Sequence, residues 1–208
     1  MIPSTHLRSW LGGLARFGWR DDRASQLVEF AVTLPLLVVF VVGIFDFSGA
    51  FTLKQKLTNI ARDAARVAAA DPATDLKSPE TAVPASVIDA FQVVDNYLVA
   101  NKINDCGITP SATPVGLTWT STAAANGCPA PGLTIIINRG YYSPPTGASL
   151  PTVACQSQNP GGLIAVVGTC VSIQYAYQWR FGRVASLLGS TVTLPTQITA
   201  TAVALNEN

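Results

Sequence analysis

The longest apolar pattern in the chain lies near its N-terminus. Residues 30–45 contain no charge over 16 positions, and after Asp46 the apolar character resumes as far as Leu53. A helix over residues 30–53 is about 36 Å long, whereas a bilayer's hydrocarbon core is about 30 Å thick. The pattern therefore predicts a membrane-spanning helix over residues 25–53.

The helical pattern continues beyond the predicted span. One side carries apolar and small residues: Leu53, Leu57, Ile60, Ala61, Ala64 and Ala68. Another side carries polar residues: Gln55, Asn59, Arg62 and Arg66. The Asp71-Pro72 pair ends the pattern, because helical geometry is unfavourable for the residue before a proline. We expect one helix from about Ser25 to Ala70, roughly 69 Å long, whose second half supports a separate head.

The remainder of the chain, residues 54–208, is predicted to form this head. A connector over residues 72–84 precedes a second amphipathic helix that ends near Asn101 and has one apolar face: Val87, Ile88, Phe91, Val94 and Leu98. Loops are predicted over residues 105–132 and 143–162, strands over 133–138, 171–180 and 198–205, and a helical turn over 184–188. Alternation over 171–180 indicates a half-buried strand. The fold class is α+β, with a small antiparallel sheet against the long helix.

Charge and composition narrow the possible partners. The chain has 208 residues, 12% of them charged, and a net charge of +1, which favours neither a nucleic-acid partner nor an acidic substrate. Four arginines precede the span, which favours a cytoplasmic N-terminus: Arg8, Arg16, Arg20 and Arg23. The basic residues after the span oppose this orientation, but the cysteine-bearing remainder is typical of an exported domain. Residues 1–24 are predicted to be a cytoplasmic leader that is removed, because the apolar segment follows the expected cut.

Four cysteines indicate disulfides rather than a metal site. They are Cys106, Cys128, Cys155 and Cys170, without any CxxC pair, and the sole histidine, His6, precedes the span. Three pairings are possible; we favour Cys106 with Cys128 and Cys155 with Cys170, because both close local loops. Each such loop contributes about 3 kcal/mol in the chain-entropy model. Four free thiols are the alternative, and we expect no metal or cofactor.

Glu29 is a carboxylate at the start of the apolar helix. A charge within a membrane costs several kcal/mol unless it is interfacial, neutralised or paired. In one interpretation Glu29 stays among the headgroups and gains about 0.3–1 kcal/mol from the helix dipole. In the other, cleavage before Ser25 creates an amine that pairs with Glu29 of a neighbouring subunit.

Three blocks carry a family resemblance. SQLVEFAVTLPLL (25–37), GIFDF (43–47) and LTNIARDAARVAA (57–69) together resemble the TadE-like pilin proteins of the bacterial tight-adherence (Flp pilus) apparatus. The resemblance implies a pilin-like fold and cleavage by a prepilin peptidase between Ala24 and Ser25, which makes Glu29 the fifth mature residue. Ala24 stands where this family usually has glycine.

The resemblance also implies a role and a location. The expected protein is a non-catalytic minor pilin or pseudopilin that assembles or primes a Flp-type pilus for surface adherence. It spans the bacterial inner membrane once, with a periplasmic head, and its partners are other pilin subunits and the Tad secretion machinery. Subunit assembly is assigned to four positions: Glu29, Phe30, Pro35 and Asp46. For Pro35 the alternative is a simple helix bend, and for Asp46 solvation at the outer interface.

Two other functional classes remain as alternatives. A membrane-anchored periplasmic binding module would use an aromatic patch for its ligand: Tyr141, Tyr142, Tyr175, Tyr177 and Trp179. Such residues also stabilise sheets by cross-strand packing, which is the simpler interpretation. A cell-envelope hydrolase would need a carboxylate pair, but Asp89 and Asp95 fall on different faces of the second helix. With one histidine before the span, we do not expect an enzyme.

Overall fold

The computed structural model describes residues 22–77, 83–110, 114–142, 154–156, 167–181 and 194–206. The chain divides into two compact units, Met1–Val41 and Val42–Asn208. Helix α1, Asp22–Ala70, contributes to both. It agrees with the predicted long helix, apart from starting three residues earlier, and it is long and apolar enough to cross a membrane.

The second half of α1 is the spine of the larger unit. The predicted apolar face from Leu57 onward is buried, and the predicted polar face, including Arg62 and Arg66, is exposed. After α1, a 3₁₀ helix (Ala73–Lys77) lies in the predicted connector, and α2 spans Ala85–Ala100. The face of α2 predicted to be apolar is buried, except for the half-buried Ile88.

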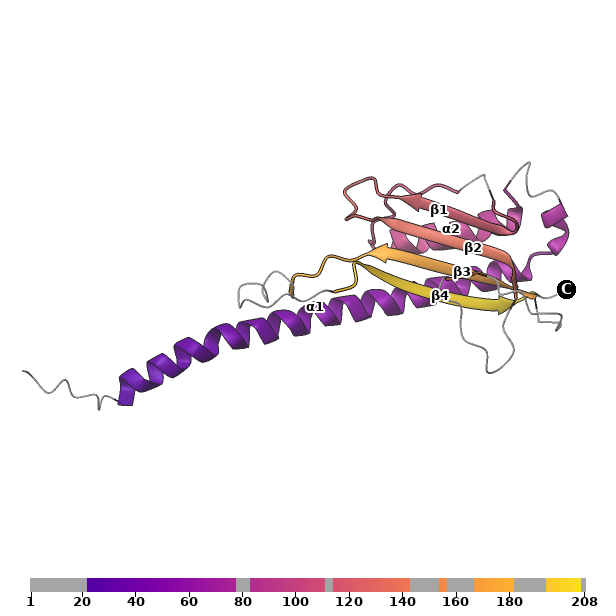
Figure 1. The fold of residues 1–208 in the computed structure, drawn as a ribbon. Coiled ribbons are helices and arrows are strands. Elements are labelled where there is room, and N and C mark those ends of the chain that lie inside the picture. The colour runs from indigo at the N-terminus through magenta and orange to yellow at the C-terminus, as the bar shows by residue number, and fades with distance from the viewer. Residues whose placement is uncertain are drawn as a thin grey trace, which may run out of the picture. The chain divides into compact units, whose positions relative to one another are not determined.

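Four strands form one antiparallel sheet in the order β1-β2-β3-β4 (Figure 1). They are β1 (Thr118–Ala123), β2 (Leu133–Tyr142), β3 (Val167–Ala176) and β4 (Gln197–Leu205). The α+β fold class is thereby confirmed, as is the last predicted strand. Strand β1 lies in a segment predicted to be a loop. Its threonines and serine give a weak apolar signal, and pairing with β2 holds it in place.

The prediction for residues 171–180 was wrong in extent and in burial. Strand β3 starts earlier, at Val167, and ends at Ala176. Both of its faces are largely buried, so it is not half-exposed. It lies between β2 and β4, and its side chains face the helices on one side and a second small cluster on the other.

The main core lies between the helices and one face of the sheet. It unites residues of α1, α2 and all four strands, among them Leu57, Ile60, Val94, Leu98, Trp119, Ile135, Ile173 and Ile198. The alanines of α1 at 61, 64 and 68 are completely buried, because their short side chains let the helix approach its neighbours closely. This packing fixes the second half of α1 relative to the sheet.

The opposite face of the sheet carries a smaller cluster of Tyr141, Cys155 and Cys170. An irregularity in the pairing of β2 with β3 lies between Asn138 and Tyr141. Such a bulge changes which face the following side chain joins. It explains how Arg139 faces the helices while Tyr141 joins Cys170 behind the sheet. The helical turn predicted over 184–188 lies outside the described residues.

Candidate functional site

The predicted assembly residues Glu29, Phe30 and Pro35 lie in the first half of α1. Glu29 is exposed and the Phe30 side chain is 63% exposed. Pro35 stands inside the helix, where it cannot donate the backbone hydrogen bond that other residues donate. The peptide bond between Ala24 and Ser25, where cleavage is predicted, lies near the start of α1, after its third residue.

Large apolar side chains cover this half of the helix and are exposed on every side. They include Leu27, Val28, Val32, Leu34, Leu36, Leu37, Val38, Phe40 and Val41. A water-soluble protein seldom exposes so extensive an apolar surface, which usually marks contact with a membrane or another protein. One N-terminal apolar helix thus suggests a single-pass membrane anchor.

Asp46 has a different environment, in the larger unit. Only 7% of it is exposed, and its Oδ2 accepts hydrogen bonds from the backbone N–H groups of Arg180 (2.7 Å) and Phe181 (2.8 Å). The hydroxyl of Tyr177 donates to the Asp46 carbonyl at 2.9 Å and lies 3.4 Å from Oδ1. We call residues 177–181, which follow β3, the strap. The strap satisfies the carboxylate that the sequence places in the apolar helix.

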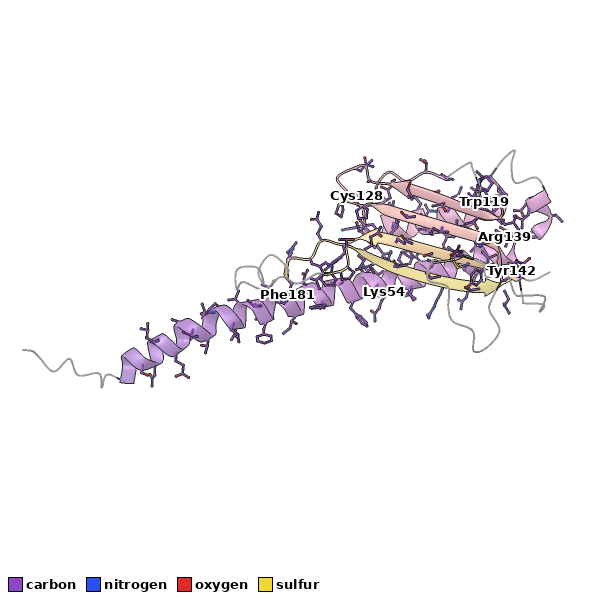
Figure 2. All side chains as sticks on the ribbon, in the orientation of Figure 1. Lys54, Trp119, Cys128, Arg139, Tyr142 and Phe181 are labelled. Carbon is purple, nitrogen blue, oxygen red and sulfur yellow. A yellow bond between two sulfur atoms is a disulfide. The ribbon has the colours of Figure 1, made fainter. Side chains whose placement is uncertain are left out.

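Aromatic rings and two glycines complete the contact between α1 and the strap. The Phe47 ring lies 5.1 Å from the Trp179 ring and 6.1 Å from the Phe181 ring, measured between centroids. A Cβ atom on Gly43 would lie 3.2 Å from the Phe181 ring, and one on Gly49 would lie 2.9 Å from the Tyr177 hydroxyl. These glycines therefore let the strap approach the helix backbone, and Figure 2 labels Phe181 at this contact.

The Tyr177 phenol is held as a hydrogen-bond donor. Burial raises its pKa most, and the negative charge of Asp46 and the hydrogen bond to it raise the pKa further. Arg180 acts in the opposite direction. The pKa shift favours the neutral phenol, so the hydroxyl keeps the proton that it donates to Asp46.

These contacts change the interpretation of the aromatic patch. Tyr177 and Trp179 were expected in a strand, packing across the sheet, but both follow the end of β3 and contact α1. The Trp179 indole N–H donates to the Pro195 carbonyl at 2.6 Å. Tyr141 and Tyr175, by contrast, are buried on opposite faces of the sheet, so the five aromatics do not form one surface.

A second polar centre, which the sequence did not reveal, lies where α1 ends. The Arg139 guanidinium (Figure 2) is 1% exposed and donates to the carbonyls of Ala68 and Asp71, the latter at 3.0 Å. It also donates to the Thr169 hydroxyl at 2.9 Å. A cation is favourable at a helix C-terminus, where carbonyls lack partners within the helix. Arg139 thus joins the end of α1 to β2 and β3.

The charge of Arg139 is buried at some energetic cost. Burial lowers the pKa of its guanidinium, while Asp75 and then Asp71 raise it. Because arginine ionises far above neutral pH, the side chain stays charged and needs its hydrogen-bond acceptors. Nothing in the local sequence of β2 indicates these acceptors, since they come from residues distant in the chain.

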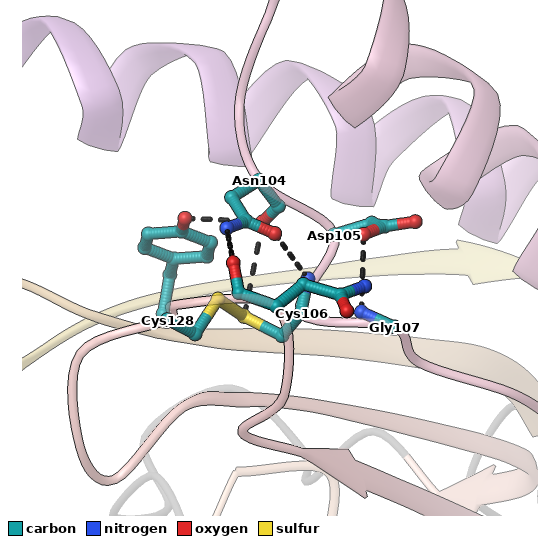
Figure 3. The surroundings of a disulfide bond; sticks show 7 residues. Asn104, Asp105, Cys106, Gly107 and Cys128 are labelled. Atoms are coloured by element: carbon teal, nitrogen blue, oxygen red, sulfur yellow. Dashed lines mark hydrogen bonds between the residues drawn. A yellow bond between two sulfur atoms is a disulfide. The ribbon is translucent and has the colours of Figure 1, made fainter.

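Both cysteine pairs form disulfides, Cys106 with Cys128 and Cys155 with Cys170. This is the pairing that the local-loop argument favours. Around the first, the Asn104 side chain accepts from the Cys106 backbone N–H at 2.8 Å, as Figure 3 shows. The Tyr175 hydroxyl donates to the Asn104 carbonyl at 3.0 Å, which ties this loop to the sheet.

The residues that the structure describes offer no cluster of three or more histidine, cysteine or acidic side chains able to hold a metal ion. Asp95 has a raised pKa, mainly because it is partly buried and also because Asp105 is nearby. Asp89, by comparison, is exposed on the same helix.

Comparison with known proteins gives one family match. The family described as TadE-like protein matches residues 24–66. No curated protein and no solved structure matches the chain. The matched segment contains all four predicted assembly positions, and the match implies a role associated with the Tad pilus.

Proposed function

We propose that this chain, whose residues 24–66 are TadE-like, is a non-catalytic minor pilin or pseudopilin of a Tad (Flp-type) pilus. In this role it assembles or primes the pilus for surface adherence. The TadE-like match is the observation that carries the proposal. It covers the exposed apolar half of α1, whose side chains need a lipid or protein surface to cover them.

The proposal includes the topology expected from the sequence. Residues 1–24 are a cytoplasmic leader, residues 25–53 span the bacterial inner membrane, and residues 54–208 form a periplasmic head. A prepilin peptidase cuts between Ala24 and Ser25. The disulfides of the head support an oxidising compartment for it.

The contrast between the two carboxylates of the span supports our proposal that Glu29 has the assembly role. The strap satisfies Asp46 with donors from its own chain. Glu29 is exposed, and its charge is costly once the helix leaves the headgroups for an apolar bundle. The new amine of Ser25 on a neighbouring subunit is a partner of opposite charge. Asp46, in this account, positions the head on the helix rather than pairing subunits.

The binding-module alternative loses part of its basis in the structure. Tyr177 uses its hydroxyl on Asp46, and Trp179 uses its indole N–H on Pro195. Neither polar group is therefore available to orient a ligand without breaking a contact within the head. We favour the pilus role for this reason.

The test is to delete the gene and restore it on a plasmid, and then to count surface pili and shear them from the cells. We expect the deletion to abolish or strongly reduce piliation and the restored protein to start at Ser25 by N-terminal sequencing. Replacing Ala24 with a bulky residue should block this maturation. Unchanged piliation after deletion would contradict the proposal, and an intact Met1 in a peptidase-positive cell would contradict the processing step.

A further inference from the structure

The surface of α1 around Asp46 combines a buried charge with exposed apolar side chains. Asp46 lies beneath the strap, while Ile44, Phe45, Phe47 and Phe51 are between 51% and 74% exposed. Phe47 contacts Trp179 with part of its ring and leaves the rest uncovered. The strap therefore lies beside an apolar surface that continues the candidate membrane span.

Helix length indicates how deep this surface lies. From Glu29 to Asp46 an α-helix rises about 26 Å, and from Glu29 to Phe51 about 33 Å, compared with a hydrocarbon core of about 30 Å. If Glu29 lies at the cytoplasmic headgroups, Asp46 reaches the far boundary of the hydrocarbon. An ionised carboxylate is costly there without donors, and the strap supplies two backbone N–H groups. The strap must then lie at the same boundary.

The strap has the side chains that favour such a boundary. Trp179 is half-buried with its N–H bonded to Pro195, and tryptophan is enriched at membrane interfaces. Arg180 is exposed, and among the described residues no ion pair involves its guanidinium. Long basic side chains at this depth extend towards the headgroups.

A cleft opens between α1 and the strap at this position. It has a volume of about 460 Å³ and is lined by Val42, Phe45, Asp46, Tyr177, Gln178 and Arg180. Val42 and Phe45 line it with apolar side chains next to Asp46, whereas Gln178 and Arg180 contribute an exposed amide and an exposed cation. Such a division suits the junction between an acyl chain and a phosphate.

We propose that the strap and this cleft bind a phospholipid of the outer leaflet of the inner membrane. The Arg180 guanidinium binds the lipid phosphate, because a planar guanidinium donates two parallel hydrogen bonds to phosphate oxygens. The acyl chain lies along Phe45, and the Trp179 ring lies in the headgroup layer. The two strap N–H groups that donate to Asp46 offset part of its negative charge beside the phosphate. The inference rests on the proposed membrane insertion of α1.

The depth of Trp179 is tested with the full-length protein in phosphatidylglycerol vesicles that carry brominated acyl chains. The emission of a Trp179→Phe variant, subtracted from that of the wild type, isolates this tryptophan from the other three. We expect strong quenching with bromine near the headgroup and weaker quenching with bromine near the chain end. Inserted protein whose Trp179 is not quenched overturns the inference but leaves the pilus proposal standing. Protein that fails to insert contradicts both.

The phosphate contact is tested by native mass spectrometry of protein released from phosphatidylglycerol nanodiscs. Arg180→Gln should lower the retained lipid several-fold, because it removes the charge from the contact. Arg62→Gln is the matched control, since Arg62 is exposed on the polar side of α1, sixteen residues beyond Asp46. Equal lipid retention in the two variants overturns the contact. Thermal unfolding of both variants checks that the head remains folded.

Discussion

The two halves of α1 are one continuous helix in two different environments. Between Ser25 and Val41 nearly every residue is exposed, although most are apolar. Between Val42 and Ala70 the helix buries one face against α2 and the sheet. The first half is therefore built to be covered by a surface outside the chain, whereas the second half obtains its stability within the chain. Substitutions in the first half should therefore impair contacts with that outer surface, whereas substitutions in the second half should lower the stability of the head.

The largest effect on stability is expected at Arg139 of β2, whose guanidinium binds the carbonyls at the end of α1. Arg139→Met should lower the free energy of unfolding of the head by about 2–5 kcal/mol, because several buried acceptors lose their donor. Chemical denaturation measures this. Arg62→Met, on the exposed face of α1, should change stability little. Equal effects of the two substitutions would show that the buried cation does not fix the end of the helix.

The next largest effect is expected from the Cys155–Cys170 disulfide, which lies on the face of the sheet opposite the helices. Replacing Cys155 and Cys170 together by serine should destabilise the head by about 2–4 kcal/mol, and replacing Cys106 and Cys128 should have a similar cost. Denaturation of each double variant gives the values, and mass spectrometry of non-reduced peptides verifies the remaining bridge. Alkylation of four thiols in the native protein would contradict both bridges.

A smaller loss is expected at Asp46. Asp46→Ala leaves the N–H groups of Arg180 and Phe181 without their acceptor, which should cost about 1–3 kcal/mol. Hydrogen exchange at these two amides should become faster. Asp63→Ala is the control, because Asp63 is exposed on the same helix. Unchanged exchange in the Asp46 variant would show that the strap is held by other contacts.

The smallest effect concerns pH. Burial, with a contribution from Asp105, raises the pKa of Asp95 in the folded state above that in the unfolded state. The folded state then binds more protons between these two pKa values, so this residue's contribution to stability falls as pH rises through that window. Asp95→Asn should remove the fall and raise the melting temperature slightly at neutral pH. Asp89→Asn should leave the pH dependence of stability unchanged, because Asp89 is exposed. Identical pH profiles for the wild type and both variants would contradict the assignment of this pH dependence to Asp95.

The sequence predicted the local features of this fold well and the long-range ones poorly. The extent of α1 and its buried face follow from periodicity and from Pro72, which act over a few residues. The contacts of the strap with Asp46 join positions up to 135 residues apart, and the contacts of Arg139 join two strands and a helix end. No local pattern carries such information. Strand β1 was missed for a related reason, since its pairing with β2 outweighs its weak apolar signal.

The candidate site shows the same division. Sequence reasoning and the family resemblance together selected Glu29 and Asp46 as the two carboxylates of the span. The structure then separated them, because one is exposed and the other is bonded to the strap. An assembly role for Glu29 remains a proposal, and it follows from a charge that the described contacts of the chain do not satisfy.

Recovery of a Glu29→Ala protein in the sheared surface fraction is the decisive test of the assembly role of Glu29. We expect a normal membrane level and a normal free energy of unfolding of the head, but loss of the subunit from the sheared fraction and reduced piliation. Glu29→Asp should be intermediate, since it keeps the charge on a shorter side chain. Normal piliation by a stable Glu29→Ala protein would contradict this role, and would leave Glu29 as an interfacial residue at the start of a helix.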